Sequence, residues 1–501
     1  MKKSKPDILY GFIVTSFLCL AIFSIFRLAS YEKNIETTYE TFGKTPVVVS
    51  SPIGKKNDQL IFISHGFAGS TTFMRPIAIA LAEAGFITIR FDYLGHGKHP
   101  EPYSGDITTI KGATQNFVKQ TEIIIDHFLN KYKLETGLII GHSMASDIVI
   151  RTAKKSSQIE GVIGISTYSD AVTETHPKNL LILNGQWEPP LRAKARDILI
   201  SLGIKNPTEG KLYGEFKNGT ARKVVAVKNS DHVGVLYSST TQREIIAWAN
   251  QIYQENYNIV TNSIGLWAGL LFLSLFILFI CSLKFFPDRK LERGTLSFRN
   301  FIFASILATF IIPYALKFFT PTLVAFPAHN HLISHLLLMS IVLSVVTPVK
   351  LNEPLIKSFN LQIFAFLFVT FSLVFGNVLN SYVSTFYLSD GRIGLFLLMA
   401  IGCVPIMIVI QSFYQVEKYD WMIGNLAKLF ILISLSISIW LDLEKLFILG
   451  YAVILLIAFS IIFGFLANLL NRKYNDVLSI GTANGLVLAW TFATALPIYI
   501  P

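Results

Sequence analysis

The stretch Leu138-Ile139-Ile140-Gly141-His142-Ser143-Met144-Ala145 decides the fold of the N-terminal half of this chain. An apolar run ends there at a Gly-x-Ser-x-Ala turn, and a more polar stretch with helical spacing follows. This pattern is typical of a strand that turns sharply into a helix and exposes one serine hydroxyl above the N-terminus of that helix. The sequence therefore predicts that Ser143 is a nucleophile.

Apolar strands and helical stretches alternate on both sides of this turn. Helices are expected at residues 76–84, 117–132, 147–155 and 243–253, and strands at 59–64, 86–91, 137–140, 162–166, 180–184 and 224–228. Strands that alternate with helices favour a mostly parallel sheet with helices on both faces. The stretch 206–222, rich in Gly, Lys and Asn, is interpreted as a loop.

Short polar motifs follow four of the expected strands. In chain order they are His65-Gly66-Phe67, Asp92-Tyr93-Leu94-Gly95-His96-Gly97, the Ser143 turn and Asp231-His232. With these motifs in this order, residues from about 45 to 255 resemble the α/β-hydrolases. The motifs match that family's oxyanion loop, its D-x-x-G-x-G turn, its nucleophile elbow and the place of its histidine. The resemblance implies an α/β-hydrolase fold with little or no lid and a serine hydrolase activity. Ala145 is a departure, because the family usually has glycine there.

The resemblance also implies a catalytic triad of serine, carboxylate and histidine. Ser143 and His232 match the first and last members. Glu188 stands where the family usually has aspartate, and Asp170, after the preceding strand, is the alternative acid. In such a triad the histidine takes the serine proton and passes it to the leaving group, while the carboxylate fixes the tautomer of the histidine.

The oxyanion hole is expected to consist of the backbone N–H groups of Phe67 and Met144. His65 and His142 flank the expected site and are interpreted as packing or supporting residues. Only about 13 residues, 167–179, join the strand after the elbow helix to the next strand. This segment leaves no room for a cap domain, so the site is expected to be open or covered by another part of the protein.

Composition separates the soluble part of the chain from the rest. The whole chain is 52% hydrophobic and 15% charged, yet residues from about 30 to 258 have the composition of an ordinary soluble domain. The three cysteines, Cys19, Cys281 and Cys403, all lie in apolar runs. The soluble part therefore has no disulfide, no cysteine metal site and no catalytic thiol. No sequence motif implies a cofactor or a metal.

Apolar runs long enough to cross a membrane occupy the rest of the chain. Eight are expected at about 262–283, 299–319, 328–347, 361–380, 393–414, 424–441, 445–469 and 477–498. A further run at 8–26 is interpreted as an uncleaved anchor helix, with a cleaved signal peptide as the alternative. The predicted domains are an anchor at 1–29, an α/β-hydrolase domain at 30–258 and an all-helical membrane bundle at 259–501.

The net charge of +11 is interpreted as a consequence of membrane orientation and not as a sign of nucleic-acid binding. With the N-terminus inside, the inside segments contain Lys2, Lys3, Lys5, Lys284, Arg289, Lys290, Arg293, Arg299, Lys350, Lys357, Lys418, Arg472 and Lys473. The short outside segments contain little beyond Lys317 and Arg392. Basic residues concentrate in cytoplasmic loops. The hydrolase domain is therefore expected outside the cytoplasm of a multi-pass cell-membrane protein.

Histidines cluster at the outer end of the third C-terminal run. They are His329, His331 and His335, with Asn330 among them, and the last two histidines are four residues apart on one helix face. The cluster is either a metal or substrate site or a set of polar groups at headgroup level. Possible further members are Asn377, Asn380, Asp390, Asp442 and Glu444.

Three hypotheses for function follow. The first is a membrane-integral serine hydrolase that cleaves an ester or related acyl bond of a membrane lipid or an acylated envelope substrate through an acyl-enzyme. The second is an acyltransferase with a membrane-borne acceptor. The third is a transporter or assembly factor whose hydrolase-like domain does no chemistry.

Overall fold

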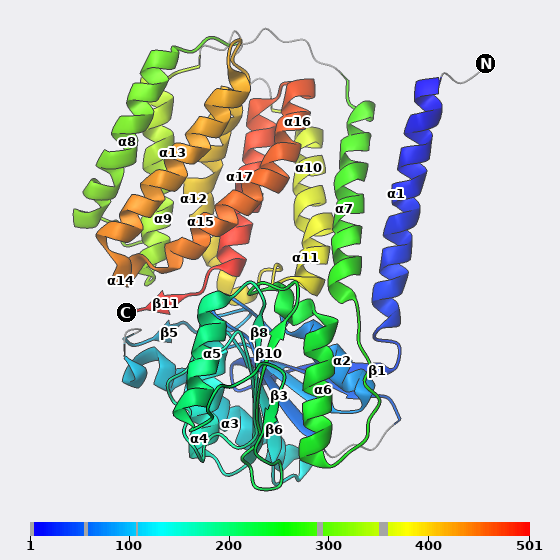
Figure 1. Cartoon of the computed structure of the whole chain (residues 1–501). Coiled ribbons are helices and arrows are strands. Elements are labelled where there is room, and N and C mark those ends of the chain that lie inside the picture. The colour runs from blue at the N-terminus through cyan, green and yellow to red at the C-terminus, as the bar shows by residue number, and fades with distance from the viewer. Residues whose placement is uncertain (1–4, 55–58, 107–108, 288–293, 350–358) are drawn as a thin grey trace. The chain divides into compact units, whose positions relative to one another are not determined.

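A computed structural model describes residues 5–54, 59–106, 109–287, 294–349 and 359–501 (Figure 1). The chain divides into an α/β unit, Ile22–Leu271 with Ser381–Thr385, and a helical unit, Met1–Ala21, Phe272–Asn380 and Phe386–Pro501. Seven of the basic residues used for orientation lie outside the described residues: Lys2, Lys3, Arg289, Lys290, Arg293, Lys350 and Lys357.

The α/β unit is built on a nine-stranded sheet with the order β1-β2-β4-β3-β6-β7-β8-β10-β9. The strands are β1 (Ile35–Phe42), β2 (Thr45–Pro52), β3 (Leu60–Ser64), β4 (Ile87–Phe91), β6 (Gly137–His142), β7 (Ile159–Ile165), β8 (Leu180–Gly185), β10 (Arg222–Val227) and β9 (Leu212–Tyr213). The six strands from β4 to β10 pair in parallel, and β1, β2 and β9 are antiparallel to their neighbours. All residues of β3, β4, β6 and β8 are buried, as expected for a parallel sheet that is covered on both faces.

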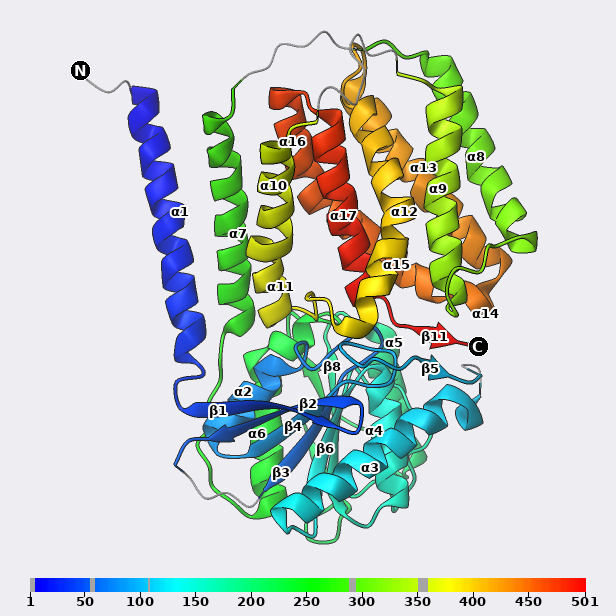
Figure 2. The same ribbon diagram turned by 180° about the vertical axis from the view of Figure 1, so that it is seen from behind.

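Helices cover both faces of this sheet (Figures 1 and 2). They are α2 (Arg75–Ala84), α3 (Gln115–Tyr132), α4 (Met144–Lys155), α5 (Pro189–Ser201) and α6 (Ser239–Tyr253). On one face, apolar side chains of α2 and α6 such as Leu81 and Ile245 share a buried core with Ile63, Ile140 and Leu183 of the strands. The α3 and α4 helices pack together on the other face.

Two parts of this unit were not predicted from the sequence. The antiparallel pair β1 and β2 extends the sheet beyond β4, and α5 follows directly after β8. The expected loop at 206–222 also contains the short strand β9, which pairs with β10. The short elements β5 (Tyr103–Ser104), η1 (Ile110–Thr114) and η2 (Gly234–Tyr237) were not predicted either, and each predicted strand and helix is present to within a few residues at its ends.

Nine helices of the described chain are long and apolar enough to span a membrane, Ile8–Ser30 and eight between Ile264 and Ala495. The corresponding elements are α1 (Lys5–Ser30), α7 (Ile264–Ser282) with η3 (Leu283–Phe285), α8 (Phe298–Phe318), α9 (Pro327–Val346), α10 (Leu361–Val369) with η5 (Thr370–Phe375) and α11 (Gly376–Tyr382), α12 (Asp390–Phe413), α13 (Asp420–Leu441), α15 (Ile448–Phe459) with η6 (Ser460–Gly464) and α16 (Phe465–Tyr474), and α17 (Val477–Ala495). A short helix, α14 (Leu443–Leu446), lies between α13 and α15. Together with the sheet, these helices confirm the predicted fold class.

The α12 and α17 helices pack closely because small residues line their contact. A Cβ atom at Gly485 would lie 2.6 Å from Cα of Val404, and one at Gly481 would lie 2.7 Å from Cα of Ile408. Glycines four residues apart let two membrane helices approach to backbone contact. The helical unit is therefore a packed bundle around α17.

Candidate active site

Ser143 occupies a sharp turn between β6 and α4. Its φ and ψ are 54° and −119°, a strained conformation for a residue with a side chain, at a cost of about 1–3 kcal/mol. Its N–H donates to the carbonyl of Ile165 at 2.8 Å, which ties the turn to the neighbouring strand. A Cβ atom at Gly141 would lie 2.4 Å from the carbonyl oxygen of Ala145, so the strand and helix leave room only for glycine there. The strain is thus held in place by the surrounding packing.

His232 lies on the loop after β10, with its ring beside the serine. Its Nε2 atom is 2.8 Å from Oγ of Ser143, within hydrogen-bond distance. The adjacent Asp231 accepts hydrogen bonds from the N–H groups of Val233 and Gly234 through Oδ1. These bonds fix the loop that contains His232. The His232 side chain is 48% exposed, so a substrate can reach it.

Glu188 holds the other side of the His232 ring. Its Oε1 atom is 2.5 Å from Nδ1 of His232, and its Oε2 atom accepts from Oγ of Ser166 and the N–H of Gly185. Burial alone would raise the pKa of Glu188, but these hydrogen bonds outweigh it and lower the pKa below its usual value. The carboxylate is therefore charged and oriented toward the histidine.

The structure does not bring the alternative acid Asp170 to the histidine. Its Oδ1 atom lies 2.5 Å from a guanidinium nitrogen of Arg151, and its side chain is 68% exposed. Arg151 also pairs with Asp147 at 2.6 Å. Of the two acids considered from the sequence, only Glu188 contacts His232.

The loop that contains Phe67 passes directly over the serine turn. A Cβ atom at Gly66 would lie 2.9 Å from Cβ of Ser143, so the loop can come this close only with glycine at that position. His65 fastens the loop, because its Nδ1–H donates to the carbonyl of Gly66 and its Nε2 accepts from the N–H of Tyr93. Phe67 thus directly follows Gly66, which lies next to Ser143.

Met144, the other expected oxyanion residue, is the first residue of α4. Its backbone N–H is among the N-terminal amides of a helix, which have no partner within the helix and favour a developing negative charge. The two residues that the resemblance assigns to the oxyanion hole therefore come from different elements, Phe67 from the loop beside Ser143 and Met144 from the start of α4.

His142 supports the loop that contains His232. Its Nε2–H donates to the carbonyl of His232 at 2.9 Å. Burial and the nearby His232 lower its pKa to about 4, so His142 is neutral near pH 7. Its place agrees with the supporting role expected from the sequence.

A cavity of about 420 Å³ opens onto the serine and the histidine. Its apolar wall includes Ile110, Ile148 and Leu191, and its polar wall includes Arg151 and Tyr168. Sequence reasoning did not assign these residues to the site. Ser166 was not assigned to the site from the sequence either. Its position at the end of the strand next to the one that leads to Ser143 could have identified it.

The histidines expected to cluster in the membrane bundle all lie buried on α9. The ring centroids of His331 and His335 are 5.6 Å apart, as their spacing on one helix face predicts. Within the described residues, no group of three His, Cys, Asp or Glu side chains is arranged to hold a metal ion. Asn377 and Asn380 bond to the loop residues Tyr387 and Phe386.

Comparison with known proteins agrees with this fold. Residues 55–225 match a family model described as serine aminopeptidase, S33. No curated protein matches the chain.

Similar solved structures include TT1662 from Thermus thermophilus, at 17% identity over 44% of this chain and 99% of that one, with a TM-score of 0.34. They also include a dienelactone hydrolase from Anabaena variabilis, at 14% identity over 45% and 100%, with a TM-score of 0.33. A third is a soluble variant of monoglyceride lipase from Saccharomyces cerevisiae, at 12% identity over 43% and 95%, with a TM-score of 0.32. The family match and the sheet topology together show that the α/β unit has the α/β-hydrolase fold.

Proposed function

We propose that this protein is a membrane-integral serine hydrolase that cleaves an ester or related acyl bond through an acyl-enzyme. One observation carries the proposal. The hydroxyl of Ser143 lies 2.8 Å from Nε2 of His232, and Nδ1 of the same ring lies 2.5 Å from Glu188. A nucleophile, a base and an orienting carboxylate in this order are the requirement for serine activation.

The proposed reaction has two halves. His232 removes the proton of Ser143 as its Oγ attacks the acyl carbon, and then gives that proton to the leaving oxygen as the acyl–oxygen bond breaks. A water molecule, deprotonated by the same ring, then attacks the acyl carbon, the bond from that carbon to Oγ of Ser143 breaks, and His232 returns the proton to Oγ as the acid leaves. The negative oxygen formed in each half would be held by the N–H groups of Phe67 and Met144, and one such donor is worth roughly 10²–10³ in rate.

The lining of the cavity favours a substrate with an acyl ester over a peptide substrate with a free amino terminus. An aminopeptidase needs an uncompensated carboxylate to bind the terminal ammonium group of its substrate. The two carboxylates that line this cavity, Asp147 and Asp170, are both paired with Arg151. The apolar side chains of Ile110, Ile148 and Leu191 suit an acyl chain instead.

The substrate class and the location are parts of the same proposal. The hydrolase domain is joined at both of its ends to helices that are long enough to span a membrane, Ile8–Ser30 and Ile264–Phe285. A catalytic domain tethered in this way meets membrane-borne substrates at high effective concentration. We therefore propose a cell-membrane location, a hydrolase domain outside the cytoplasm, and a lipid or acylated envelope component as substrate.

Kinetics with three substrates test this proposal. The purified full-length protein in detergent would be given p-nitrophenyl butyrate, a diacylglycerol lipid in mixed micelles, and leucine p-nitroanilide, each with Ser143→Ala as the control. We expect turnover of both esters, little turnover of the anilide, and a loss of at least ~10³-fold in the variant. A preference for the anilide would show that the protein is an aminopeptidase and not an esterase. Transfer of the acyl group to an added alcohol would favour the acyltransferase hypothesis.

A further inference from the structure

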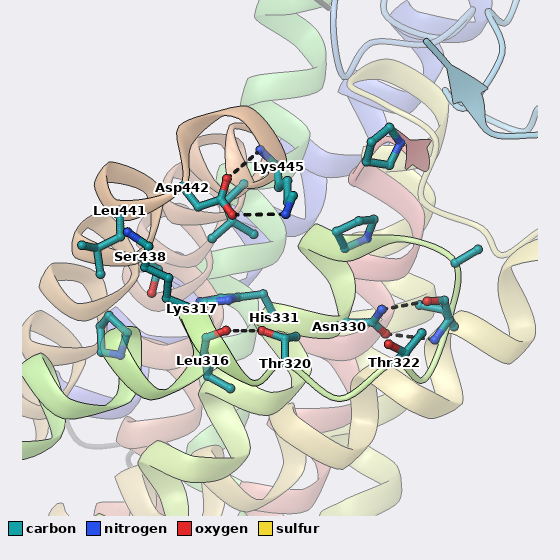
Figure 3. A pocket seen from close by; sticks show the side chains of 16 residues that line it. Leu316, Lys317, Thr320, Thr322, Asn330, His331, Ser438, Leu441, Asp442 and Lys445 are labelled. Carbon is teal, nitrogen blue, oxygen red and sulfur yellow. Dashed lines mark hydrogen bonds and ion pairs between the residues drawn. The ribbon is translucent and has the colours of Figure 1, made fainter. Parts of the chain in front are cut away.

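The helical unit contains a second cavity, of about 320 Å³, at the ends of four helices. Figure 3 shows the side chains that line it, which come from the C-terminal end of α8, the following loop, the first turns of α9, and the segment from α13 to α14. Ser143 and its partners belong to the other unit, so this cavity is independent of the proposed hydrolase activity.

The walls of this cavity are held in one conformation by internal hydrogen bonds. Asn330 accepts from the N–H groups of Leu323 and Val324 and donates to the carbonyl of Val324, which fastens the loop between α8 and α9. Asp442 caps α14 by accepting from the N–H of Lys445. The cavity is therefore pre-formed and does not depend on a ligand to order its walls.

Positive charge exceeds negative charge among the described side chains of the lining. Lys317 and Lys445 line the cavity together with Asp442. Lys445 lies 3.9 Å from Asp442, whereas Lys317 has no ion pair with any residue that the structure describes. One carboxylate thus faces two ammonium groups, and such a lining attracts an anion and repels a cation.

His331 lies in the wall of the same cavity, beside the ring of His335. His331 is only 3% exposed, and its Nε2 atom has no hydrogen-bond partner within the described part of the chain. A buried polar atom left unpaired is unfavourable, so a ligand oxygen that pairs with this ring strengthens binding. In a neutral imidazole one ring nitrogen carries a proton, and that N–H is a donor for a ligand oxygen.

Apolar side chains make up the rest of the lining. They include Leu316, Val324, Leu441 and Leu446. We propose that this cavity binds the phosphate or carboxylate head group of an anionic amphiphile, with Lys317, Lys445 and His331 around the head group and the leucines along the start of its chain.

Calorimetric titration of the full-length protein tests this proposal. Ser143→Ala protein in a nonionic detergent would be titrated with dioctanoyl phosphatidic acid, dioctanoyl phosphatidylcholine and inorganic phosphate, so that no turnover consumes a probe. We expect one saturable site for the acidic lipid and at least tenfold weaker binding of the other two. The double variant Lys317→Gln and Lys445→Gln should weaken the acidic lipid at least tenfold, whereas Lys205→Gln with Lys217→Gln, a matched loss of charge in the α/β unit, should not.

His331→Leu gives a second readout. It should weaken the acidic lipid and should not lower the melting temperature of the protein without ligand, because it removes a buried unpaired group. The absence of saturable binding, or equal binding by the wild type and the double lysine variant, would overturn the site. If inorganic phosphate binds as tightly as the lipid, the cavity is an anion site, but the proposal that its ligand is an amphiphile is overturned.

Discussion

The Oε1 atom of Glu188 lies 2.5 Å from Nδ1 of His232, while Asp170 pairs with Arg151. This geometry predicts that Glu188→Gln lowers kcat on p-nitrophenyl butyrate by roughly 10³–10⁴, because the amide cannot stabilise the imidazolium. Asp170→Asn, the matched neutralisation of the rival acid, should change kcat less than about tenfold. The reverse ranking would transfer the role of the acid to Asp170.

Gly66 is predicted to be needed for the approach of the oxyanion loop to the nucleophile. In Gly66→Ala the new Cβ atom would lie 2.9 Å from Cβ of Ser143. The loop must then shift, so we expect kcat to fall about 10²-fold or more, as for the loss of an oxyanion donor. Gly269→Ala is the control, because a Cβ atom there meets nothing within 4 Å and the residue has ordinary helical backbone in α7. An unaffected kcat in Gly66→Ala would place the oxyanion donors elsewhere.

His142 makes stability depend on pH. Its pKa falls from 6.5 to about 4 on folding, so the unfolded chain binds more protons between these values. Folding stability is therefore intact above pH 6.5 and is lost as the pH falls toward 4, by about 3 kcal/mol for this residue. His142→Gln does not titrate, and its loss of stability over the same range should be smaller by about that amount. Unfolding followed by tryptophan fluorescence at several pH values measures the difference, and parallel curves would contradict it.

The proposed orientation makes a labelling prediction. Cys19, Cys281 and Cys403 would first be replaced by alanine, and single cysteines placed at Lys205 in the hydrolase domain and at Arg299 near the start of α8. In intact cells an impermeant maleimide should label the first and not the second, because basic loops stay in the cytoplasm. Labelling of Arg299→Cys alone would invert the orientation.

The elbow was predictable from the sequence because its signal is local. The apolar run, the Gly-x-Ser-x-Ala turn and the following helix all lie within about 20 residues. Glu188 was preferred from the sequence through the family pattern alone, and Asp170 stayed the alternative because both follow strands that lead to the same edge of the sheet. The deciding factor is tertiary, since Arg151 from α4 pairs with Asp170, and Ser166 and Gly185 orient Glu188.

The missed elements have similar physical reasons. The β1 strand is mostly polar, because only some of its side chains are buried, and so it lacks an apolar run. The α5 helix begins with Pro189 and Pro190, which favour the first turn of a helix but interrupt a helical pattern in the sequence. Residues that line the serine cavity from other elements, such as Ile110 at the start of η1 (Ile110–Thr114), are brought there by the fold and have no local signature.

Labelling with a fluorophosphonate probe shows whether Ser143 is an activated nucleophile, because the probe reacts with an activated serine and not with an ordinary one. The full-length protein would be incubated with the probe and digested, and the modified residue located by mass spectrometry. The account predicts one modified residue, Ser143, no labelling of Ser143→Ala, and much slower labelling of His232→Gln. Undiminished labelling of Ser143→Ala, or an unlabelled but folded wild type, would contradict it.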